Sequence, residues 1–466
     1  MTWKPDAERL ANNKLSRKKI TTTLGTVGAS QTVNLLTGVL NVIVLSRWLE
    51  PAGRGTFVFL TLIAQFILLL LEFGLPNTIT TFLLRQEYGF QTVFSNALFL
   101  ALLRVCLCSF VAVITWLMWP KYNELGGQAL LLLCLICAVD TLLMLAKTVL
   151  FTVGDMGRWL IIDAGIAVSL FTAIMLSWVF AVSNSPLYAL LLYVFTRFIG
   201  MGVAFLFAGR YVMIRTAING VIIRQIMRFS LKNVLNNVVW SVGNRADLYV
   251  VSAMMSPAML GIYSVATGMA DKMQSVLMAI PQGLYPSQAV AQDDGGRVEN
   301  ITARAVRLSL AIGIAAAVFV GIVSPFAVPF LFGAEYASAA VPLIVLSANS
   351  VFFIPFHLFG GYMTGRKMQP QISAAFGAIM VLINVAGNLL LIPIIGILGA
   401  AFANLASTIV VLVLFAAFFA RIAHIIPRDL FLVTYEDVYT LGQMLGRFLH
   451  LGRSYLARRF VRAARD

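Results

Sequence analysis

Long apolar runs, each bounded by glycine, proline or charge, constrain the fold of this chain more than any other feature. An α-helix needs roughly 20 apolar residues to cross a hydrocarbon core of about 30 Å, and every run reaches that length. The runs are continuous and do not alternate with polar residues, so they predict spanning helices rather than barrel strands. We expect twelve spans, at residues 21–47, 56–84, 92–119, 127–153, 158–182, 186–209, 232–255, 258–285, 305–331, 337–364, 370–394 and 397–421.

The composition agrees with an all-α polytopic membrane protein. Of the 466 residues, 60% are hydrophobic and 11% are charged, and a soluble domain of this size cannot bury that much apolar surface. The formal net charge of +15 would by itself suit nucleic acid or an anionic membrane surface. The basic residues, however, lie in short segments between the apolar runs, as in cytoplasmic loops, and this distribution argues against nucleic acid as a partner.

The distribution of basic residues also predicts the orientation of the chain. With the N-terminus inside, 26 of the 34 Lys and Arg residues fall in cytoplasmic segments or at the cytoplasmic ends of spans. Six more lie elsewhere within spans, leaving only Arg54 and Lys121 in external loops. Cytoplasmic loops of membrane proteins carry such an excess of Lys and Arg, and an error of one span would abolish the bias. We therefore expect twelve spans with both termini in the cytoplasm.

An internal repeat relates the two halves of the chain. The expected external turns at 51–57 and 257–263 share Pro, Ala, Gly and an aromatic residue at a constant offset of 206 residues. The same offset divides the spans six and six, and an even number of spans gives both halves the same orientation. We expect parallel repeats, related by an axis along the membrane normal and enclosing a cavity, as in a transporter.

This repeat sets the predicted domains. A linker and a tail, both basic and amphipathic, follow the two bundles on the cytoplasmic side, and the tail suits a helix on an anionic inner leaflet. A partly disordered, solvated tail is the alternative. The domains are a basic N-terminus at 1–20, six-helix bundles at 21–209 and 232–421, the linker at 210–231 and the tail at 422–466.

Charged residues inside the spans should face a polar interior, because each costs about 2.5–3.5 kcal/mol at the bilayer centre on insertion scales. We count nine in spans two to eight: Glu72, Arg104, Asp140, Lys147, Arg197, Arg245, Asp247, Asp271 and Lys272. Five cations against four anions leave an excess of positive charge, to which Arg47 near the end of span one adds. Such a cavity suits an anionic substrate such as phosphate or pyrophosphate. The alternative is that these charges form structural ion pairs between helices.

Neutral polar residues extend this pattern along spans one and seven. Span one carries a stripe that includes Asn34 and Asn41, and the repeat offset places Asn41 at the position equivalent to Asp247. In a continuous helix Arg245 and Asp247, two residues apart, point to nearly opposite faces and cannot satisfy each other. Each therefore needs a partner from another helix or from a polar cavity.

Cysteine and histidine give no indication of a metal or redox centre. The four cysteines lie inside apolar runs, and the one CxxC pair, Cys134 and Cys137, has neither a second pair nor a nearby histidine. Inert packing is the stronger interpretation of such residues. The three histidines lie far apart in the sequence, so we expect no metal and no cofactor.

Three ordered stretches of sequence carry a family resemblance. The first is Ser46-Arg47-Trp48-Leu49-Glu50-Pro51 with Gly53 and Gly55, followed by Phe73-Gly74-Leu75-Pro76. The second is Asn244-Arg245-Ala246-Asp247, then Gly261-Ile262-Tyr263-Ser264-Val265-Ala266 and Leu284-Tyr285-Pro286. The third runs from Phe332-Gly333-Ala334-Glu335-Tyr336 through Asn384, Asn388 and Leu391-Ile392-Pro393 to Gly396-Ile397-Leu398-Gly399-Ala400-Ala401. In this order they resemble the MOP flippase superfamily, in its polysaccharide-biosynthesis, Wzx-like branch.

The resemblance implies two six-helix bundles in a V shape. It also implies outward movement of an undecaprenyl-diphosphate-linked oligosaccharide by alternating access, for O-antigen, capsule or exopolysaccharide synthesis. By resemblance, the substrate-binding residues are Arg47, Arg245 and Asp247. The argument from charges within the membrane adds Arg104, Lys147, Arg197 and Lys272, and the polar stripe adds Asn34 and Asn41. Whether H⁺ or Na⁺ drives transport stays open, with Glu72, Asp140, Asp247 and Asp271 as candidate coupling groups.

The expected location is the bacterial cytoplasmic (inner) membrane, with a lipid-linked oligosaccharide as cargo. Membrane lipids and, in a polysaccharide assembly system, a polymerase and chain-length proteins are the expected partners. A MATE-like multidrug antiporter is the alternative of the same class, although cationic drugs would favour an acidic cavity. A membrane-embedded polymerase or ligase would need a sizeable external loop, and every expected external loop is short. An assembly scaffold without transport is the last alternative.

Overall fold

The structure is a computed structural model that describes residues 17–72, 75–85, 88–118, 125–212, 218–228, 230, 243, 245–290 and 297–432. Throughout these ranges the chain is helical, without strands, which confirms the all-α fold. The helices divide into two compact units: residues 1–268 with 328–338 form unit 1, and residues 269–327 with 339–466 form unit 2. The predicted domain boundaries at the 210–231 linker stay predictions, as does the amphipathic tail, most of which lies outside the described residues.

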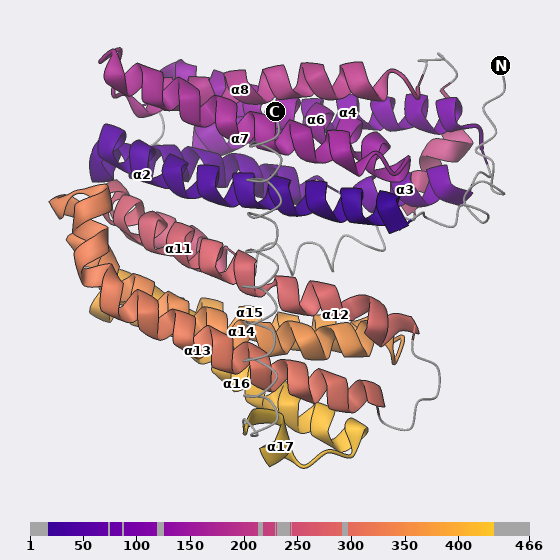
Figure 1. Cartoon of the computed structure of the whole chain (residues 1–466). Coiled ribbons are helices and arrows are strands. Elements are labelled where there is room, and N and C mark those ends of the chain that lie inside the picture. The colour runs from indigo at the N-terminus through magenta and orange to yellow at the C-terminus, as the bar shows by residue number, and fades with distance from the viewer. Residues whose placement is uncertain are drawn as a thin grey trace, which may run out of the picture. The chain divides into compact units, whose positions relative to one another are not determined.

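Unit 1 is built from long helices that lie side by side (Figure 1). α6 is central, because it contacts α2, α3, α4, α7 and α8. Unit 1 contains α2 (Arg17–Leu70), α3 (Leu75–Arg85), α4 (Phe90–Met118), α6 (Gly126–Thr152), α7 (Met156–Val179), α8 (Pro186–Ala208), α10 (Ala246–Met254) and the first part of α11 (Pro257–Leu277).

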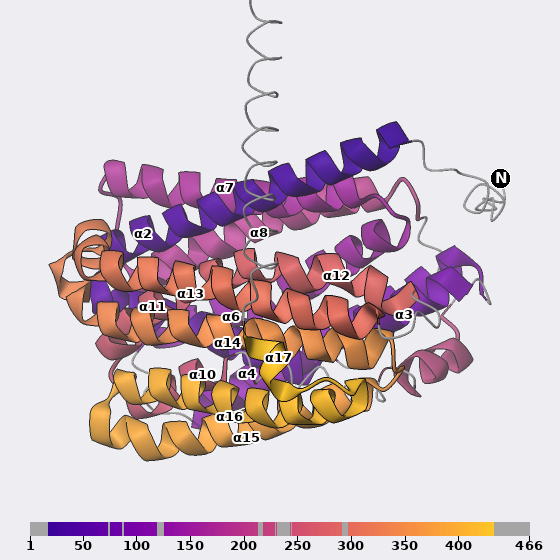
Figure 2. The same ribbon diagram turned by 60° about the horizontal axis from the view of Figure 1, so that its bottom comes forward.

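Unit 2 packs α14 against α12, α15 and α16 (Figure 2). Its elements are the end of α11, α12 (Ala279–Val290), most of α13 (Arg297–Phe332), α14 (Ala340–Gly365), α15 (Pro370–Ile395), α16 (Ile397–Ala423) and α17 (Pro427–Phe431), while the 3₁₀ turn η1 (Ala334–Ala339) lies mainly in unit 1. α15 and α16 form a tight hairpin because Gly396 adopts a φ of 62°, which is open to glycine without steric strain.

Nine helices within the described ranges are long and apolar enough to cross a membrane. One of them, α2, contains two predicted spans, because its backbone breaks at Glu50 with φ 56° and ψ 174°. Arg54 Nη1 donates to the carbonyl oxygen of Val42 at 2.9 Å, although residues 12 apart in a straight helix are separated by about 18 Å. The chain therefore turns back on itself at Glu50, and Pro51 opens the returning helix. The total of twelve spans stays a prediction.

Three predicted spans differ from the structure in their continuity. The second span ends as α2 at Leu70 and resumes as α3 at Leu75, and the eighth breaks at Met278 between α11 and α12. In the described part of the seventh, the backbone breaks at Arg245, which has φ −136° and precedes α10. The expectation of opposite faces for Arg245 and Asp247 assumed one continuous helix, so it does not apply. Hydropathy averages over a run of residues and contains no backbone angles, so it does not locate these breaks, even where Glu72 or Arg245 lies beside one.

The two repeat sequences meet in a reciprocal contact inside unit 1. A Cβ atom on Gly55 would lie 1.7 Å from the carbonyl oxygen of Pro257, and a Cβ atom on Gly261 would lie 2.0 Å from that of Pro51. The two glycines are related by the repeat offset of 206 residues, and so are the two prolines. Only glycine permits this approach of two helix backbones, which explains why the repeat keeps a glycine at both positions.

Candidate functional site

A layer of charged residues separates two apolar clusters in the core of unit 1. One cluster contains the residues of α4, α6 and α8 nearer one end of the unit, and the second contains those nearer the other end. Between them lie Arg104 (between Ala101 and Cys108), Asp140 (between Val139 and Leu143) and Arg197 (between Val194 and Ala204). The sequence therefore breaks the apolar pattern of three neighbouring helices within one region of the unit.

A cavity of about 400 Å³ opens in this region. Its charged lining residues are Asp140 and Lys147 of α6 and Arg197 of α8, three of the residues predicted from their charge within the membrane. Asp140 and Lys147 are seven residues apart and so share one face of α6. The remaining lining residues are Pro76, Thr80, Leu143, Met144, Thr148, Phe151 and Trp159.

Every charge of this cavity takes part in an ion pair between helices. Arg197 Nη1 lies 2.6 Å from Asp140 Oδ1, which joins α8 to α6. Lys147 Nζ pairs with Asp163 Oδ1 and joins α6 to α7. All four side chains are only 17–28% exposed, so the pairs are shielded from bulk water and are held more strongly than surface pairs.

An aromatic ring lies beside each cation as well. Lys147 Nζ is 4.6 Å from the centre of the Trp159 ring, and Arg197 Cζ is 4.3 Å from the centre of the Tyr193 ring. The negative face of such a ring attracts a cation within about 6 Å. Each cation therefore has one charged and one aromatic neighbour.

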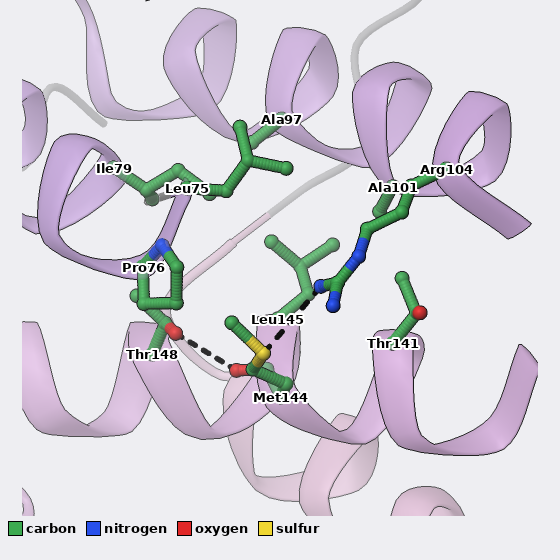
Figure 3. A pocket seen from close by; sticks show the side chains of 10 residues that line it. All are labelled: Leu75, Pro76, Ile79, Ala97, Ala101, Arg104, Thr141, Met144, Leu145 and Thr148. Carbon is green, nitrogen blue, oxygen red and sulfur yellow. Dashed lines mark hydrogen bonds between the residues drawn. The ribbon is translucent and has the colours of Figure 1, made fainter. Parts of the chain in front are cut away.

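Arg104 lies in a smaller pocket that shares Pro76, Met144 and Thr148 with the large cavity. In Figure 3 its side chain extends from α4 toward Met144 of α6. Arg104 Nη2 donates to the carbonyl oxygen of Leu68 at 2.6 Å, and Nη1 contacts the Met144 sulfur at 3.6 Å. The residue is 4% exposed, and its Nε has no hydrogen-bond partner.

Other predicted residues of α2 lie outside this cavity. Arg47 is exposed and donates from Nε to the carbonyl oxygen of Leu331 at 2.7 Å and from Nη2 to that of Phe330. Asn41 donates from Nδ2 to the carbonyl oxygen of Ala167 at 3.2 Å, and Asn34 is half-buried on α2. Their predicted roles in substrate binding stay predictions.

The candidates from the predicted seventh and eighth spans are also separate from the cavity or cannot be placed beside it. Asp247 is 4% exposed and accepts a hydrogen bond from the Tyr263 hydroxyl at 2.7 Å, while Arg245 is half-buried before α10. Asp271 and Lys272 belong to unit 2. Glu72 is half-buried after α2, within electrostatic range of Arg104.

Arg54 corrects the expectation that it occupies an external loop. It lies in the returning helix of α2 and is only 4% exposed. Besides its bond to Val42, its Nη1 donates to Ser46 Oγ at 2.6 Å and its Nε donates to Ser264 Oγ at 2.8 Å. The chain reverses at Glu50, earlier than the sequence suggested, and this places Arg54 inside the bundle.

Asp163 is the residue of this site that sequence reasoning missed. It lies within the apolar run 158–182, so the rule that selected the other nine charges should also have selected it. With Asp163 counted, ten charges within the spans comprise five cations and five anions, and the predicted positive excess among them disappears. Trp159 and Tyr193 carried no comparable signal, because aromatic residues are common in apolar spans. The described residues contain no cluster suited to a metal ion.

Two solved structures share the fold of this chain. The lipid II flippase MurJ in an inward closed conformation superposes with a TM-score of 0.69 over 86% of this chain and 88% of that chain, at 11% identity. An inward-facing MATE family transporter of the MOP superfamily has a TM-score of 0.57 over 84% of this chain and 95% of that chain, at 16% identity. The chain thus shares its fold with this flippase and this transporter.

Sequence comparison then gives the family. Residues 44–341 match the model of the polysaccharide biosynthesis protein family, and the chain belongs to that family. A probable low-salt glycan biosynthesis flippase, Agl15 of Haloferax volcanii, is 22% identical over 204 residues. That match covers 43% of this chain and 43% of the relative, so the alignment spans less than half of its length.

Proposed function

We propose that the protein is a flippase that moves a lipid-linked oligosaccharide from the cytoplasmic to the periplasmic leaflet by alternating access. The cargo is an undecaprenyl-diphosphate-linked repeat unit for O-antigen, capsule or exopolysaccharide synthesis. The protein acts in the cytoplasmic membrane as a transporter and not as an enzyme. A polymerase and chain-length proteins are its downstream partners, and H⁺ or Na⁺ is its coupling ion.

One observation supports this proposal above the others: a cavity of about 400 Å³ inside a membrane bundle carries Lys147 and Arg197 beside hydroxyl and aromatic side chains. Charged residues inside membrane spans mark the paths of substrates and ions. Lysine and arginine suit a phosphate-linked cargo, and aromatic rings and hydroxyls suit a sugar. The family and the glycan flippase relative favour this cargo over the cationic drugs of a MATE-like antiporter.

A complementation experiment tests the proposal. The wild-type protein is expressed in a bacterial strain that lacks its own flippase, across several repeat-unit backgrounds, and surface polysaccharide is measured. We expect restoration in at least one background. We also expect Arg197→Ala and Lys147→Ala to reduce it by about tenfold, since one hydrogen bond to a charged group is worth about 1.5–3 kcal/mol and 1.4 kcal/mol corresponds to a factor of ten.

Arg158→Ala is the matched control. Arg158 pairs with Asp155 at 2.6 Å on α7 and does not line the cavity, so its loss should leave surface polysaccharide near the wild-type amount. Membrane abundance of each variant is measured by immunoblot. Failure of the wild type in every background would reject the proposed cargo, and equal losses in all three variants would reject a role for the cavity.

A further inference from the structure

The cations of the cavity are already occupied within the protein. The carboxylate of Asp140 accepts a hydrogen bond from Arg197 Nη1, and that of Asp163 accepts one from Lys147 Nζ. A phosphoryl group that approaches either cation meets a carboxylate that already neutralises its charge, so the two anions compete for the same cation. The ion pairs therefore compete with an anionic cargo and do not simply attract it.

The aromatic neighbours determine what happens to a cation whose carboxylate has left. Trp159 remains beside Lys147, and Tyr193 remains beside Arg197. A cation–π contact in a desolvated site keeps the cation in place and partly compensates the lost pair. The cavity thus holds its cations in position in both the paired and the exchanged state.

The two pairs lie at different depths along α6. Asp140 and Lys147 are seven residues apart, which corresponds to about 10 Å along a helix axis at 1.5 Å per residue. The pair at Asp140 joins α6 to α8, and the pair at Lys147 joins α6 to α7. The cavity therefore contains two cationic positions with a carboxylate paired to each, and Asp163 also lies within electrostatic range of Arg197.

We propose that Lys147 and Arg197 are two successive binding positions for a phosphoryl anion, each masked by a carboxylate that the anion displaces. Asp163 masks Lys147, and Asp140 masks Arg197. This inference rests on the proposed function, because it assigns the anionic end of the cargo to this cavity. It gives the two carboxylates a role as exchangeable counter-ions in addition to their structural one.

The inference predicts opposite effects for the two members of each pair. Removing a carboxylate frees the cation and should tighten anion binding, whereas removing the cation should weaken it. A purely structural ion pair behaves differently, because losing either member leaves an unpaired buried charge and harms the site. The sign of the effect at Asp140 and Asp163 therefore separates the two explanations.

Calorimetric titration of inorganic diphosphate onto the purified full-length protein in detergent, at low salt, measures this sign. We expect Asp140→Asn and Asp163→Asn to lower Kd about tenfold and Arg197→Gln and Lys147→Gln to raise it about tenfold, the least that a hydrogen bond to a charged group supplies. Asp155→Asn is the matched control: it removes the same charge at the N-cap of α7, where Asp155 pairs with Arg158 outside the cavity. Its Kd should equal that of the wild type.

Three outcomes would overturn the inference: weaker binding in both asparagine variants, an equal gain in Asp155→Asn, or no diphosphate binding in any variant. Size-exclusion profiles establish folding, and because the two pairs use different residues, Asp163→Asn provides the test if Asp140→Asn aggregates. If the asparagine variants bind diphosphate more weakly while the wild type still restores surface polysaccharide, the masking by the two carboxylates is rejected and the proposed function is retained. If the four variants change the diphosphate Kd as expected but the wild type fails to restore surface polysaccharide, the lipid-linked cargo is rejected and the anion site is retained.

Discussion

At the scale of single residues, Asp247 illustrates how a buried charge can be structural. It lies at the start of α10, 4% exposed, with its Oδ2 bonded to the Tyr263 hydroxyl of α11. Its Oδ1 lies 2.9 Å from the following backbone nitrogen, of Leu248, where a negative charge at a helix N-terminus is favourable. This residue therefore connects two helices of unit 1, and its immediate surroundings are those of a structural contact.

Tyr263→Phe should lower the stability of the protein in detergent. The substitution removes the hydroxyl and keeps the ring, so it leaves a buried carboxylate oxygen without this donor, at an expected loss of about 1–3 kcal/mol. Thermal unfolding of the purified variant measures the loss as a lower Tm. Tyr285→Phe, which removes a hydroxyl from a side chain that is 43% exposed, is the control. A Tm shift no larger than that of the control would contradict the structural role.

At the scale of elements, the contact between α2 and α11 depends on residue size. Gly55 and Gly261 each face a backbone carbonyl of the opposite helix, whereas a Cβ atom on Gly53 would lie 3.4 Å from the Leu49 side chain, an ordinary contact distance. Backbone cannot move aside as the end of a flexible side chain can. Two glycines in the same turn of α2 therefore differ in whether there is space for a side chain.

Gly55→Ala should destabilise the protein and Gly53→Ala should not. The added methyl group at Gly55 must push α2 and α11 apart, and overpacking of this kind costs about 1–3 kcal/mol or more. Thermal unfolding of the two purified variants provides the comparison, with Gly261→Ala as a second test of the same contact. Equal Tm values for Gly53→Ala and Gly55→Ala would show that the helices do not approach so closely.

The existence of the helices could be predicted from sequence, but their breaks could not. Continuous apolar runs identify α4, α6, α7, α8 and α13–α16 closely, because only a helix satisfies the backbone in lipid. The reversal at Glu50 and the break before Ala246 depend on backbone angles that hydropathy does not contain. Arg54 illustrates the consequence. Because the chain reverses at Glu50, Arg54 lies in the core and not in the expected loop.

At the scale of the whole molecule, the orientation of the chain stays a prediction that rests on its basic residues. With Arg54 inside the bundle, Lys121 is the one basic residue left in the expected external loops, against 26 in the expected cytoplasmic segments. A twelve-span chain with both termini inside is the arrangement that gives this bias. The bias depends on the span count, so a measurement of topology tests both.

Reporter fusions should show that the segment between α4 and α6 is external and that the one between α6 and α7 is cytoplasmic. We expect alkaline phosphatase to be active when fused after Tyr122 and inactive when fused after Gly154, with green fluorescent protein showing the reverse. The physical reason is that phosphatase folds only after export. Phosphatase activity at both positions, or only after Gly154, would contradict the predicted topology.

The candidate site was predictable in part. Asp140, Lys147, Arg104 and Arg197 stand out because lipid does not tolerate charge, and three of them line one cavity. Their pairing was not predictable, because a single sequence does not state which faces of α6, α7 and α8 meet. The predicted excess of positive charge was wrong for this cavity. Once Asp163 is included, each of its charges has a partner of opposite sign.

The reciprocal glycine contact also bears on ancestry. Gly55 meets Pro257 as Gly261 meets Pro51. The glycine of each repeat thus contacts the proline of the other repeat. Identical subunits make such an isologous contact around a two-fold axis. The two repeat sequences thus meet around a local two-fold axis that passes between these two glycines, the geometry that duplication of a self-associating chain would produce.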